Sequence, residues 1–423
     1  MDAAGCADFP QVRCIVTHSQ EQIATRLPLS TPITHMTDPQ QLRVLHVVEA
    51  FGGGVFEQIR HLTARLSRHR ISTAIAYGER PETPTNIKAL ISPDVELFPL
   101  PWTERTLRAQ LQTARALRCL YADWRPDVIH LHSSFAGLLG ALTAPRSVPT
   151  VYTPHGYSFT MADQGYALRG IFGQVERFVA SRVTAIGAVS KSEAELATRV
   201  AKRAKIFIID NGVPELDEVA VRRAPISNVR PSVVAMGRLA PQHRPQETAE
   251  ILRGVTDIAD VLWIGDGRDA ADREPIERAG ITLTGWLPRE RALQHLLDSD
   301  VYVHWAAWDG QPLSVLEAMA LDSIVVASDI PPLREILPDL QRFRTAGEAT
   351  AGIREILTDP ELRSQCHTAQ ETIRTRFSAN RMAARWASVY RELLRPSENL
   401  EATPFDASPY VPHDTASESL THA

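Results

Sequence analysis

Two carboxylates stand eight residues apart in a segment that changes from loop to helix. Asp309 lies in the loop, and Glu317 lies in a helix predicted to begin near Pro312, because proline suits the first turn of a helix. Leu313, Glu317 and Leu321 recur at a spacing of four, so they share one face of that helix. A carboxylate in a row of leucines is costly to bury unless it has a partner. We interpret Glu317 as a ligand-binding residue; the alternative is a rim side chain that reaches water.

A glycine-rich loop follows the first predicted strand, residues 43–48. Gly53 and Gly54 would let the backbone approach a phosphate or a sugar, and the N-terminus of the following helix attracts negative charge. The loop is not the GxGxxG fingerprint of dinucleotide-binding enzymes, because Phe56 and Glu57 stand where the third glycine would fall. This disfavours a dinucleotide-dependent oxidoreductase. Taken alone, such glycines are more often plain turn residues.

We single out three of the histidines that follow or lie within predicted strands. His155 stands in the sequence TPHGY directly after the strand predicted over 149–153, where ligands bind in open α/β sheets. His130 and His132 alternate on one face of the strand predicted over 127–132. The sequence offers no evident third ligand beside this pair, so we interpret them as core or cleft-lining residues and predict no metal site.

Short apolar runs alternate with helical stretches along most of the chain. Such runs are typical of strands buried on both faces, and their alternation with helices of 10–18 residues predicts βαβ units and parallel sheets. The predicted strands are 43–48, 71–77, 95–98, 127–132, 149–153, 183–190 and 205–210 in the first half, and 232–236, 260–265, 281–285, 300–305 and 323–328 in the second. The sequence thus predicts an α/β fold with two doubly wound, Rossmann-like domains.

The pattern also predicts where the domains begin and end. Residues 1–40 and 397–423 lack periodicity and are interpreted as tails, with Met36 as a candidate start, while the polar, proline-containing stretch 213–231 suits a linker. The predicted units are a first domain over 41–212, a second domain over 232–378, and a C-terminal helix over 379–396 that could return to the first domain.

Composition narrows the class of protein. Hydrophobic residues make up 44% of the 423 residues and charged residues 22%, as in ordinary globular proteins. The four cysteines show no metal-ligand spacing, which fits a reducing compartment, and no run is apolar enough to span a bilayer. Residues 41–212 carry 21 Lys and Arg against 14 Asp and Glu, whereas the whole chain has a net charge of −5. This asymmetry suggests that the first domain meets an anionic surface; chance asymmetry is the alternative.

The segment from Asp309 to Ala320 resembles the signature of the retaining family 4 glycosyltransferases, which have the GT-B fold of two domains facing across a cleft. In that family the second carboxylate, here Glu317, holds the ribose of a nucleotide, and the first contacts the donor sugar. Asp309 stands where the family usually has glutamate, so the side chain is one methylene shorter. The resemblance also implies that backbone N–H groups around Leu313 and Ser314 receive the diphosphate.

The sequence GRLAPQHRP resembles the family segment after the first strand of the second domain. Arg238 matches the phosphate-binding arginine, but His243 stands where the family has lysine, and neighbouring Arg244 could compensate. If His243 faces the diphosphate, its charge depends on protonation, which a dianion would favour by raising its pKa. The resemblance further places His155 against the donor sugar or the reacting centre, and Gly53 and Gly54 beside the donor.

The resemblance implies transfer of a hexose-type sugar from a nucleoside diphosphate sugar to an acceptor hydroxyl, with retention and without a required metal or other cofactor. The expected partners are the nucleotide sugar, a lipid-linked or saccharide acceptor and an anionic membrane surface, but no nucleic acid. The expected setting is cytoplasmic, on the inner membrane face, in surface polysaccharide or glycolipid synthesis. Two alternatives stay open: a nucleotide-sugar epimerase of the same architecture, and a binding protein with a decayed site, as the departures at Asp309 and His243 would allow.

Overall fold

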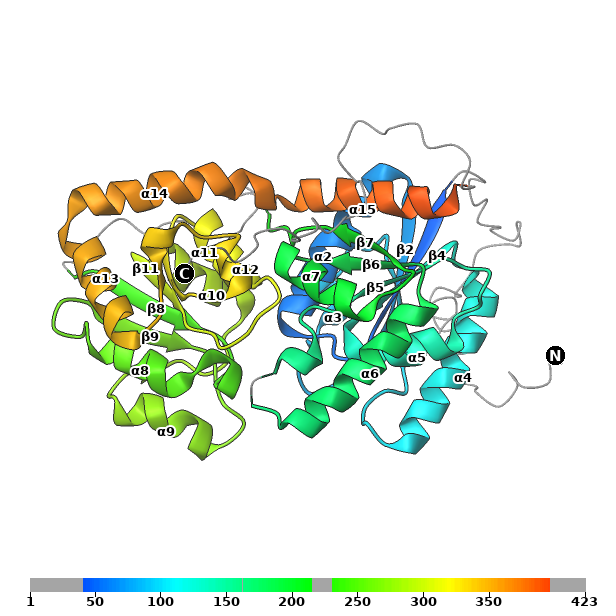
Figure 1. Cartoon of the computed structure of the whole chain (residues 1–423), viewed down its shortest axis with the longest axis horizontal. Coiled ribbons are helices and arrows are strands. Elements are labelled where there is room, and N and C mark those ends of the chain that lie inside the picture. The colour runs from blue at the N-terminus through cyan, green and yellow to red at the C-terminus, as the bar shows by residue number, and fades with distance from the viewer. Residues whose placement is uncertain (1–40, 162, 215–229, 396–423) are drawn as a thin grey trace, which may run out of the picture.

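The structure is a computed structural model that describes residues 41–161, 163–214 and 230–395. The predicted tails over 1–40 and 397–423 and most of the predicted linker lie outside these residues. The described chain forms two parallel β-sheets flanked by helices, which confirms the predicted class of two doubly wound α/β domains (Figure 1). Among the described helices, none combines the length and the apolar character needed to cross a bilayer.

The first sheet has seven strands in the order β3-β2-β1-β4-β5-β6-β7. Its strands are β1 Leu42–Val48, β2 Ile71–Gly78, β3 Glu96–Leu100, β4 Val128–His132, β5 Thr150–Thr153, β6 Ala185–Ala188 and β7 Lys205–Ile208. The central strands are buried on both faces, as their runs of Val, Ile and Leu predict. Chain order reverses between β1 and β4, and ligands bind beyond the carboxyl ends of strands at such a switch point.

The second sheet has six described strands in the order β10-β9-β8-β11-β12-β13 and its own switch point between β8 and β11. Its strands are β8 Ser232–Met236, β9 Asp260–Ile264, β10 Thr282–Leu283, β11 Val301–His304, β12 Ile324–Ser328 and β13 Arg342–Phe343. The strand predicted over 281–285 is only two residues long, because Gly285 turns the chain with a φ of 70° and forms an isolated antiparallel bridge to Gly265.

Helices connect the strands in both domains. Those of the first domain are α2 Gly53–Leu66, α3 Ile87–Leu90, α4 Leu107–Trp124, α5 Ser133–Thr143, α6 Tyr166–Arg182 and α7 Lys191–Val200. Those of the second are α8 Pro245–Arg253, α9 Ala270–Arg278, α10 Arg289–Leu297, α11 Leu313–Ala320, α12 Pro331–Arg334, α13 Ala346–Thr358 and α14 Pro360–Arg374. Ser190 caps α7 by accepting a hydrogen bond from the Glu193 backbone N–H, as its position before a helical run predicts.

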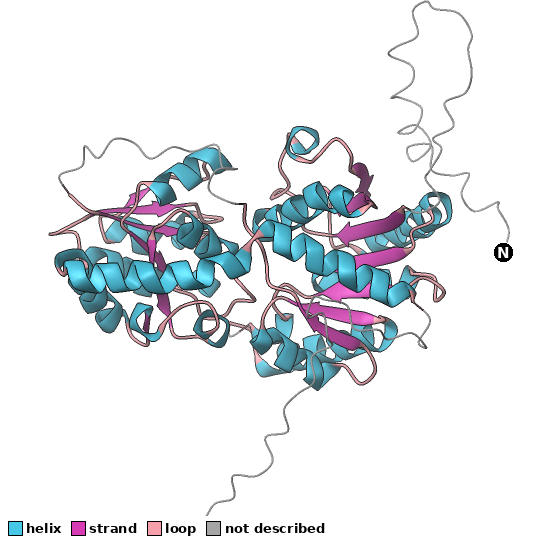
Figure 2. Ribbon diagram, turned by 90° about the horizontal axis from the view of Figure 1, so that it is seen from above, coloured by secondary structure: helices cyan, strands magenta, loops and turns pink. Residues whose placement is uncertain are grey.

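The last described helix, α15 Ala379–Leu394, leaves the second domain and packs on the first (Figures 1 and 2). Its Trp386 and Tyr390 are buried in one cluster with residues of β1 and α2, including Val44 and Leu62. The fit is close at Gly187 of β6, where a Cβ atom would lie 2.2 Å from the Trp386 ring. The helix therefore ties the two domains together.

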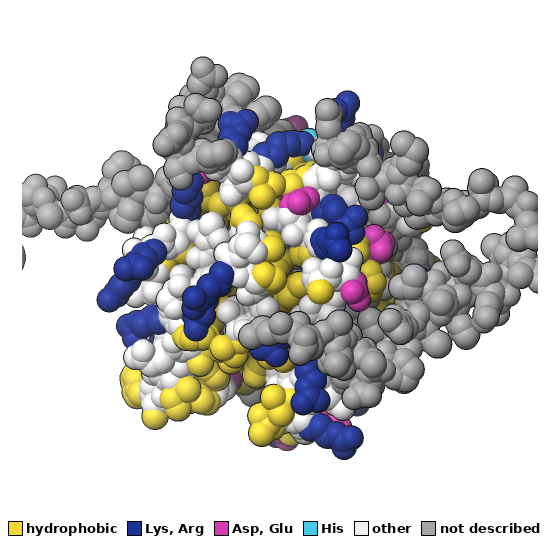
Figure 3. Space-filling model, turned by 90° about the vertical axis from the view of Figure 1, so that its right-hand side faces the viewer, with side chains coloured by type: hydrophobic (Ala, Val, Ile, Leu, Met, Phe, Trp, Pro, Cys, Tyr) yellow, Lys and Arg dark blue, Asp and Glu magenta, His cyan; other side chains and the backbone are white. Residues whose placement is uncertain are grey.

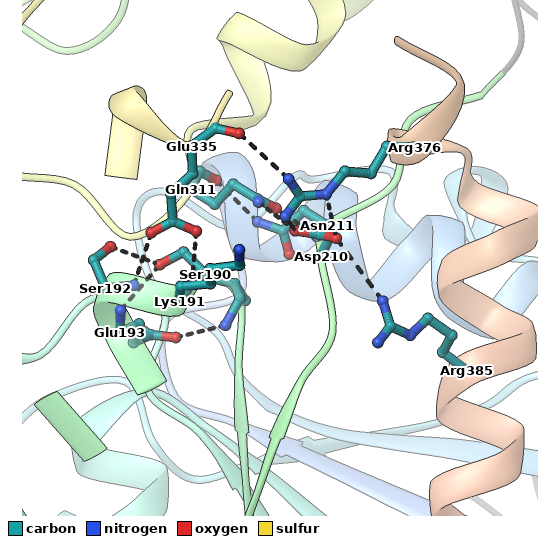
Figure 4. Close-up of polar contacts among 11 residues, drawn as sticks. Ser190, Lys191, Ser192, Glu193, Asp210, Asn211, Gln311, Glu335, Arg376 and Arg385 are labelled. Atoms are coloured by element: carbon teal, nitrogen blue, oxygen red, sulfur yellow. Dashed lines mark hydrogen bonds and ion pairs between the residues drawn. The ribbon is translucent and has the colours of Figure 1, made fainter. Parts of the chain in front are cut away.

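Several polar contacts join the domains near this crossing (Figure 4). The Glu335 carboxylate accepts hydrogen bonds from the backbone N–H groups of Lys191 and Ser192, each at 2.7 Å, at the N-terminus of α7. A negative charge is favourable there because the helix dipole is positive at that end. Asp210 pairs with Arg376 at 2.6 Å, so the segments that enter and leave the second domain are held side by side.

Candidate functional site

The structure brings together loops that follow the carboxyl ends of strands in both sheets. A Cβ atom built on Gly310 would lie 3.1 Å from the Gly156 nitrogen and 3.3 Å from the His155 carbonyl carbon. A Cβ atom built on Gly54 would lie 3.8 Å from a methyl group of Leu313. The predicted residues His155, Asp309, Gly54 and Leu313 therefore belong to one interface between the domains, although they are distant in sequence.

Helix α11 carries Glu317 and begins at this interface. Leu313 and Glu317 are both buried. Pro312 precedes the helix in an extended conformation. As at every helix start, the first backbone N–H groups have no partner within the helix. The Ser314 hydroxyl accepts a hydrogen bond from Tyr302 at 2.8 Å, which fixes this first turn on β11. Such a helix start is suited to bind an anionic group.

Glu317 has a partner that the sequence did not predict. Arg289, the first residue of α10, donates a hydrogen bond of 2.5 Å from Nη2 to Glu317 Oε1, and its Nε lies 3.2 Å from Glu57 Oε2 in α2 of the first domain. We call Glu57, Arg289 and Glu317 the carboxylate bridge. Burial raises the pKa of Glu317, and the Arg289 guanidinium opposes that rise. The buried carboxylate thus has its partner within the second domain, and the same arginine reaches Glu57 across the domain interface.

Asp309 lies at the other end of the loop before α11. Its Oδ1 accepts a hydrogen bond of 2.8 Å from the Gly310 backbone, and its Oδ2 lies 3.3 Å from His304 Nε2 on β11. The His304 ring in turn meets His243 edge to face, with ring centroids 5.8 Å apart. The shorter carboxylate is therefore held by its own loop and lies close to a histidine that sequence reasoning did not single out.

The three predicted phosphate-side residues differ in their surroundings. Arg238 is exposed and forms no ion pair with another described residue. Arg244 has a left-handed φ of 42° and pairs with Glu247 at 3.0 Å, so its charge already has a partner. Burial lowers the pKa of His243 to about 4, with His304 adding to the shift, so the ring is neutral at pH 7. The expectation of a charged His243 is thus opposed by its burial.

The first domain contributes a row of imidazoles. His155 Nε2 lies 2.9 Å from His132 Nδ1, and His132 Nε2 lies 3.0 Å from Nδ1 of His46 on β1. We call His46, His132 and His155 the histidine relay. Burial lowers the pKa of His46 and of His155 to about 3, and that of His132 falls well below the usual histidine value for the same reason. All three rings are therefore neutral at pH 7.

The third histidine beside His130 and His132, which the sequence did not reveal, is His46. One ring nitrogen from each of the three lies within 4.8 Å of the others, a spacing that could hold a metal ion. His130, however, bonds Tyr390 at 2.7 Å and Thr153 at 2.8 Å, and His132 uses both nitrogens within the relay. A metal would have to displace these hydrogen bonds, so the arrangement fits a hydrogen-bonded cluster better than a metal centre.

A buried glutamate positions the turn that carries His155. His155 and Gly156 have positive φ angles of 56° and 95°, a conformation that histidine adopts more readily than most residues and glycine adopts freely. Glu193 Oε1 accepts a hydrogen bond of 2.6 Å from the Gly156 backbone, and its Oε2 accepts one from Val189. Burial raises the pKa of Glu193 to about 7. Sequence reasoning did not single out this residue, which is the third of α7.

Comparison with known proteins places both halves of the chain in related families. Residues 53–212 match the family described as Glycosyl transferase 4-like domain, and residues 230–359 match Glycosyl transferases group 1. An uncharacterized 41.2 kDa protein in the cps region of Klebsiella pneumoniae is 23% identical over 312 residues, which are 70% of this chain and 84% of that protein.

Two further proteins show the same likeness. The Escherichia coli UDP-Gal:alpha-D-GlcNAc-diphosphoundecaprenol alpha-1,3-galactosyltransferase is 28% identical over 227 residues, 48% of this chain and 58% of that protein. Among solved structures, sucrose-phosphate synthase from Thermosynechococcus elongatus superposes with a TM-score of 0.71 over 84% of this chain and 99% of that one, at 18% identity. The structural likeness concerns the two-domain fold.

Proposed function

Because this chain belongs to the glycosyltransferases of the 4-like and group 1 families, we propose that it transfers a sugar from a nucleoside diphosphate sugar to an acceptor hydroxyl, with retention at the anomeric carbon. The observation that carries this proposal is the meeting of His155 and Gly156 with Gly310, next to Asp309, at the interface between the domains. A nucleotide-sugar epimerase and a decayed binding protein are not favoured, since the related Escherichia coli protein is a galactosyltransferase.

Each side of the interface has a proposed task. Glu317 accepts hydrogen bonds from the ribose, and the α11 start and Arg238 receive the diphosphate. Asp309 and His155 contact the donor sugar. The diphosphate gains charge as its bond to the sugar breaks, and fixed donors aimed at that charge stabilise the transition state. No step of this scheme needs a metal, so we propose that transfer continues in the presence of a chelator.

The acceptor proposed here is a lipid-linked saccharide at an anionic membrane surface in the cytoplasm. The related galactosyltransferase acts on a diphosphoundecaprenol-linked sugar. Exposed apolar side chains lie on α4, α5 and α6 of the first domain: Leu107, Leu111, Leu142, Tyr166 and Ile171. Three exposed arginines of α4 form no ion pair with other described residues: Arg108, Arg115 and Arg118. Figure 3 shows Lys and Arg side chains around hydrophobic ones on this end of the molecule. Such a mixture suits anionic lipid.

The test is incubation of the purified chain with a panel of labelled nucleoside diphosphate sugars, with and without lipid-linked saccharide acceptors and with a chelator. Release of free nucleotide that depends on the acceptor, with label in the acceptor product, supports the proposal. Isomerised nucleotide sugar without release would indicate an epimerase, and binding without turnover a decayed site. Sedimentation with anionic but not neutral vesicles tests the membrane surface, with Leu107→Glu as the variant expected to stay in solution.

A further inference from the structure

The histidine relay runs from the interior of the first domain to the domain interface. His46 and His132 are completely buried, whereas His155 keeps part of its surface exposed and its backbone lies against Gly310 of the second domain. The two nitrogen-to-nitrogen distances in the relay, 3.0 Å between His46 and His132 and 2.9 Å between His132 and His155, are those of good hydrogen bonds. The tautomer of the ring at one end of the relay therefore depends on the tautomer of the ring at the other end.

Only two proton arrangements satisfy both links when the three rings are neutral. A neutral imidazole has one N–H donor and one acceptor nitrogen, so every ring must donate in the same direction along the chain. If protons point inward, His155 donates from Nε2 and the last proton is on His46 Nε2. If they point outward, His46 donates from Nδ1, His132 donates from Nδ1 to His155 Nε2, and His155 carries its proton on Nδ1.

The buried end of the chain distinguishes the two arrangements. His46 Nε2 is buried and has no hydrogen-bond partner among the described residues. The Tyr390 ring stands edge-on with its centroid 6.5 Å from that of His46, and a ring is only a weak substitute for an acceptor. Buried N–H groups without an acceptor are rarer in folded proteins than acceptors with an unused lone pair. The outward arrangement avoids a buried, unpaired N–H group at this end.

We propose that the histidine relay fixes His155 in the tautomer that is protonated on Nδ1, so that His155 presents an N–H donor at the domain interface. His46 and His132 are then positioning residues, since they act through His155 and not on the substrate. Among the described residues none hydrogen-bonds His155 Nδ1, which leaves that group available to a ligand. The pKa values of about 3 for His46 and His155 keep the rings neutral across the physiological range.

The proposal has a chemical consequence that rests on the proposed function. With Nε2 occupied by His132 and a proton on Nδ1, His155 has no free lone pair and cannot act as a base. It can donate a hydrogen bond to an oxygen atom of the donor sugar or of the leaving diphosphate. Such a donor, held by a chain that reaches into the core, needs little reorganisation when charge develops.

The direct test is nitrogen NMR of the full chain with labelled histidine, which distinguishes protonated from unprotonated ring nitrogens. The His155 signals are assigned by their absence in His155→Asn. Protonation of His155 on Nδ1 at pH 7 is the expected result. Protonation on Nε2, or a mixture of tautomers, would overturn the proposal. So would one equivalent of tightly bound zinc whose removal shifts the signals of His46, His130 and His132.

Two variants on the same sheet test the coupling. His46→Phe removes the proton donor at the buried end, and we expect a mixed His155 tautomer and a fall in kcat of roughly tenfold with KM nearly unchanged, because the orienting partner is lost. The matched control is His130→Phe, which is equally buried but bonds Tyr390 and Thr153 outside the relay. It should lower the melting temperature and leave the His155 tautomer alone. Equal tautomer shifts in both variants would contradict the relay. If His155→Ala leaves sugar transfer intact, the role proposed for His155 in transfer is wrong, whereas the NMR result on its tautomer is unaffected.

Discussion

The two domains meet at one interface with opposite chemistry. The first domain brings neutral imidazoles, His155 and the rings behind it, whose pKa values burial lowers to about 3 or further. The second domain brings the carboxylates Asp309 and Glu317, with Arg289 beside Glu317. Near Glu317 the first domain adds the carboxylate of Glu57, which lies 3.2 Å from Arg289 of the second domain.

The two domains differ because a buried imidazole and a buried carboxylate need different partners. A neutral ring can be buried once its hydrogen bonds are satisfied. The first domain can therefore present a hydrogen-bond donor without burying a charged group. A buried carboxylate needs a cation, and Glu317 has Arg289 at 2.5 Å. We therefore expect losses in the first domain to act on turnover and losses in the second to act on donor binding and on stability.

The largest expected effect is on turnover. His155→Ala should lower kcat by about a hundredfold, because loss of one fixed donor to developing charge costs ~10²–10³ in rate. KM for the donor should change much less. Steady-state kinetics with the donor found in the panel check this, with Ser158→Ala as a control in the same loop. A proportional rise in KM with unchanged kcat would move His155 from the reacting centre to simple donor binding.

Glu317→Ala should weaken donor binding by roughly tenfold or more, since each hydrogen bond to a carboxylate is worth ~1.5–3 kcal/mol. The variant should remain folded, because Arg289 keeps Glu57 as a partner at 3.2 Å. Titration calorimetry with the donor measures the affinity, and Glu290→Ala is the control on the neighbouring helix α10. An affinity equal to that of the parent would show that Glu317 serves the carboxylate bridge and not the nucleotide.

Arg289→Met should reduce stability, by less than the ~3–5 kcal/mol that loss of one partner costs in a fully buried pair, because the Arg289 side chain is 26% exposed. The loss should grow with pH. Burial raises the pKa of Glu317, and without the guanidinium it rises further, so the carboxyl stabilises the fold when protonated and destabilises it as pH rises through that pKa.

Urea unfolding of this variant at pH 5 and pH 8 measures the effect. Arg60→Met is a matched control, since Arg60 is 27% exposed and pairs with the same Glu57, but within α2. Equal losses in the two variants would mean that contact between the domains contributes nothing beyond the local pair. A loss that shrinks at high pH would contradict the assigned role of Glu317.

The smallest expected effect concerns His243. With a pKa lowered to about 4, the ring stays neutral from about pH 6 to 9, so donor affinity should vary less than about twofold over that range. Arg238→Ala should weaken binding at every pH, because its charge is permanent. Affinity that falls steadily as pH rises would show that the bound diphosphate lifts the pKa of His243 into this range and that the ring binds in its charged form.

Local patterns in the sequence were sufficient for much of the fold. The alternation of apolar runs with helices predicted two doubly wound domains, and the capping role of Ser190 was predicted from its position before a helical run. The segment around Asp309 and Glu317 drew attention through its own spacing. These features depend on residues within a few turns of one another, where the periods of helix and strand act.

The tertiary structure alone decided the partners of these residues. His46 and His132 are 86 positions apart in the sequence. They meet because β1 and β4 are neighbours in the first sheet, and their parallel register places Val48, two residues after His46, opposite His132. Arg289, at the start of α10, meets Glu57 because the two domains dock with α11 against α2. Strand register and domain docking are set by the sum of many distant contacts, and no local period in the sequence encodes them. The sequence by itself therefore indicated a subset of the side chains that could do chemistry, such as Glu317 and His155. Only folding added partners such as His46 and Arg289 and decided which groups are neutral, which are paired and which face each other.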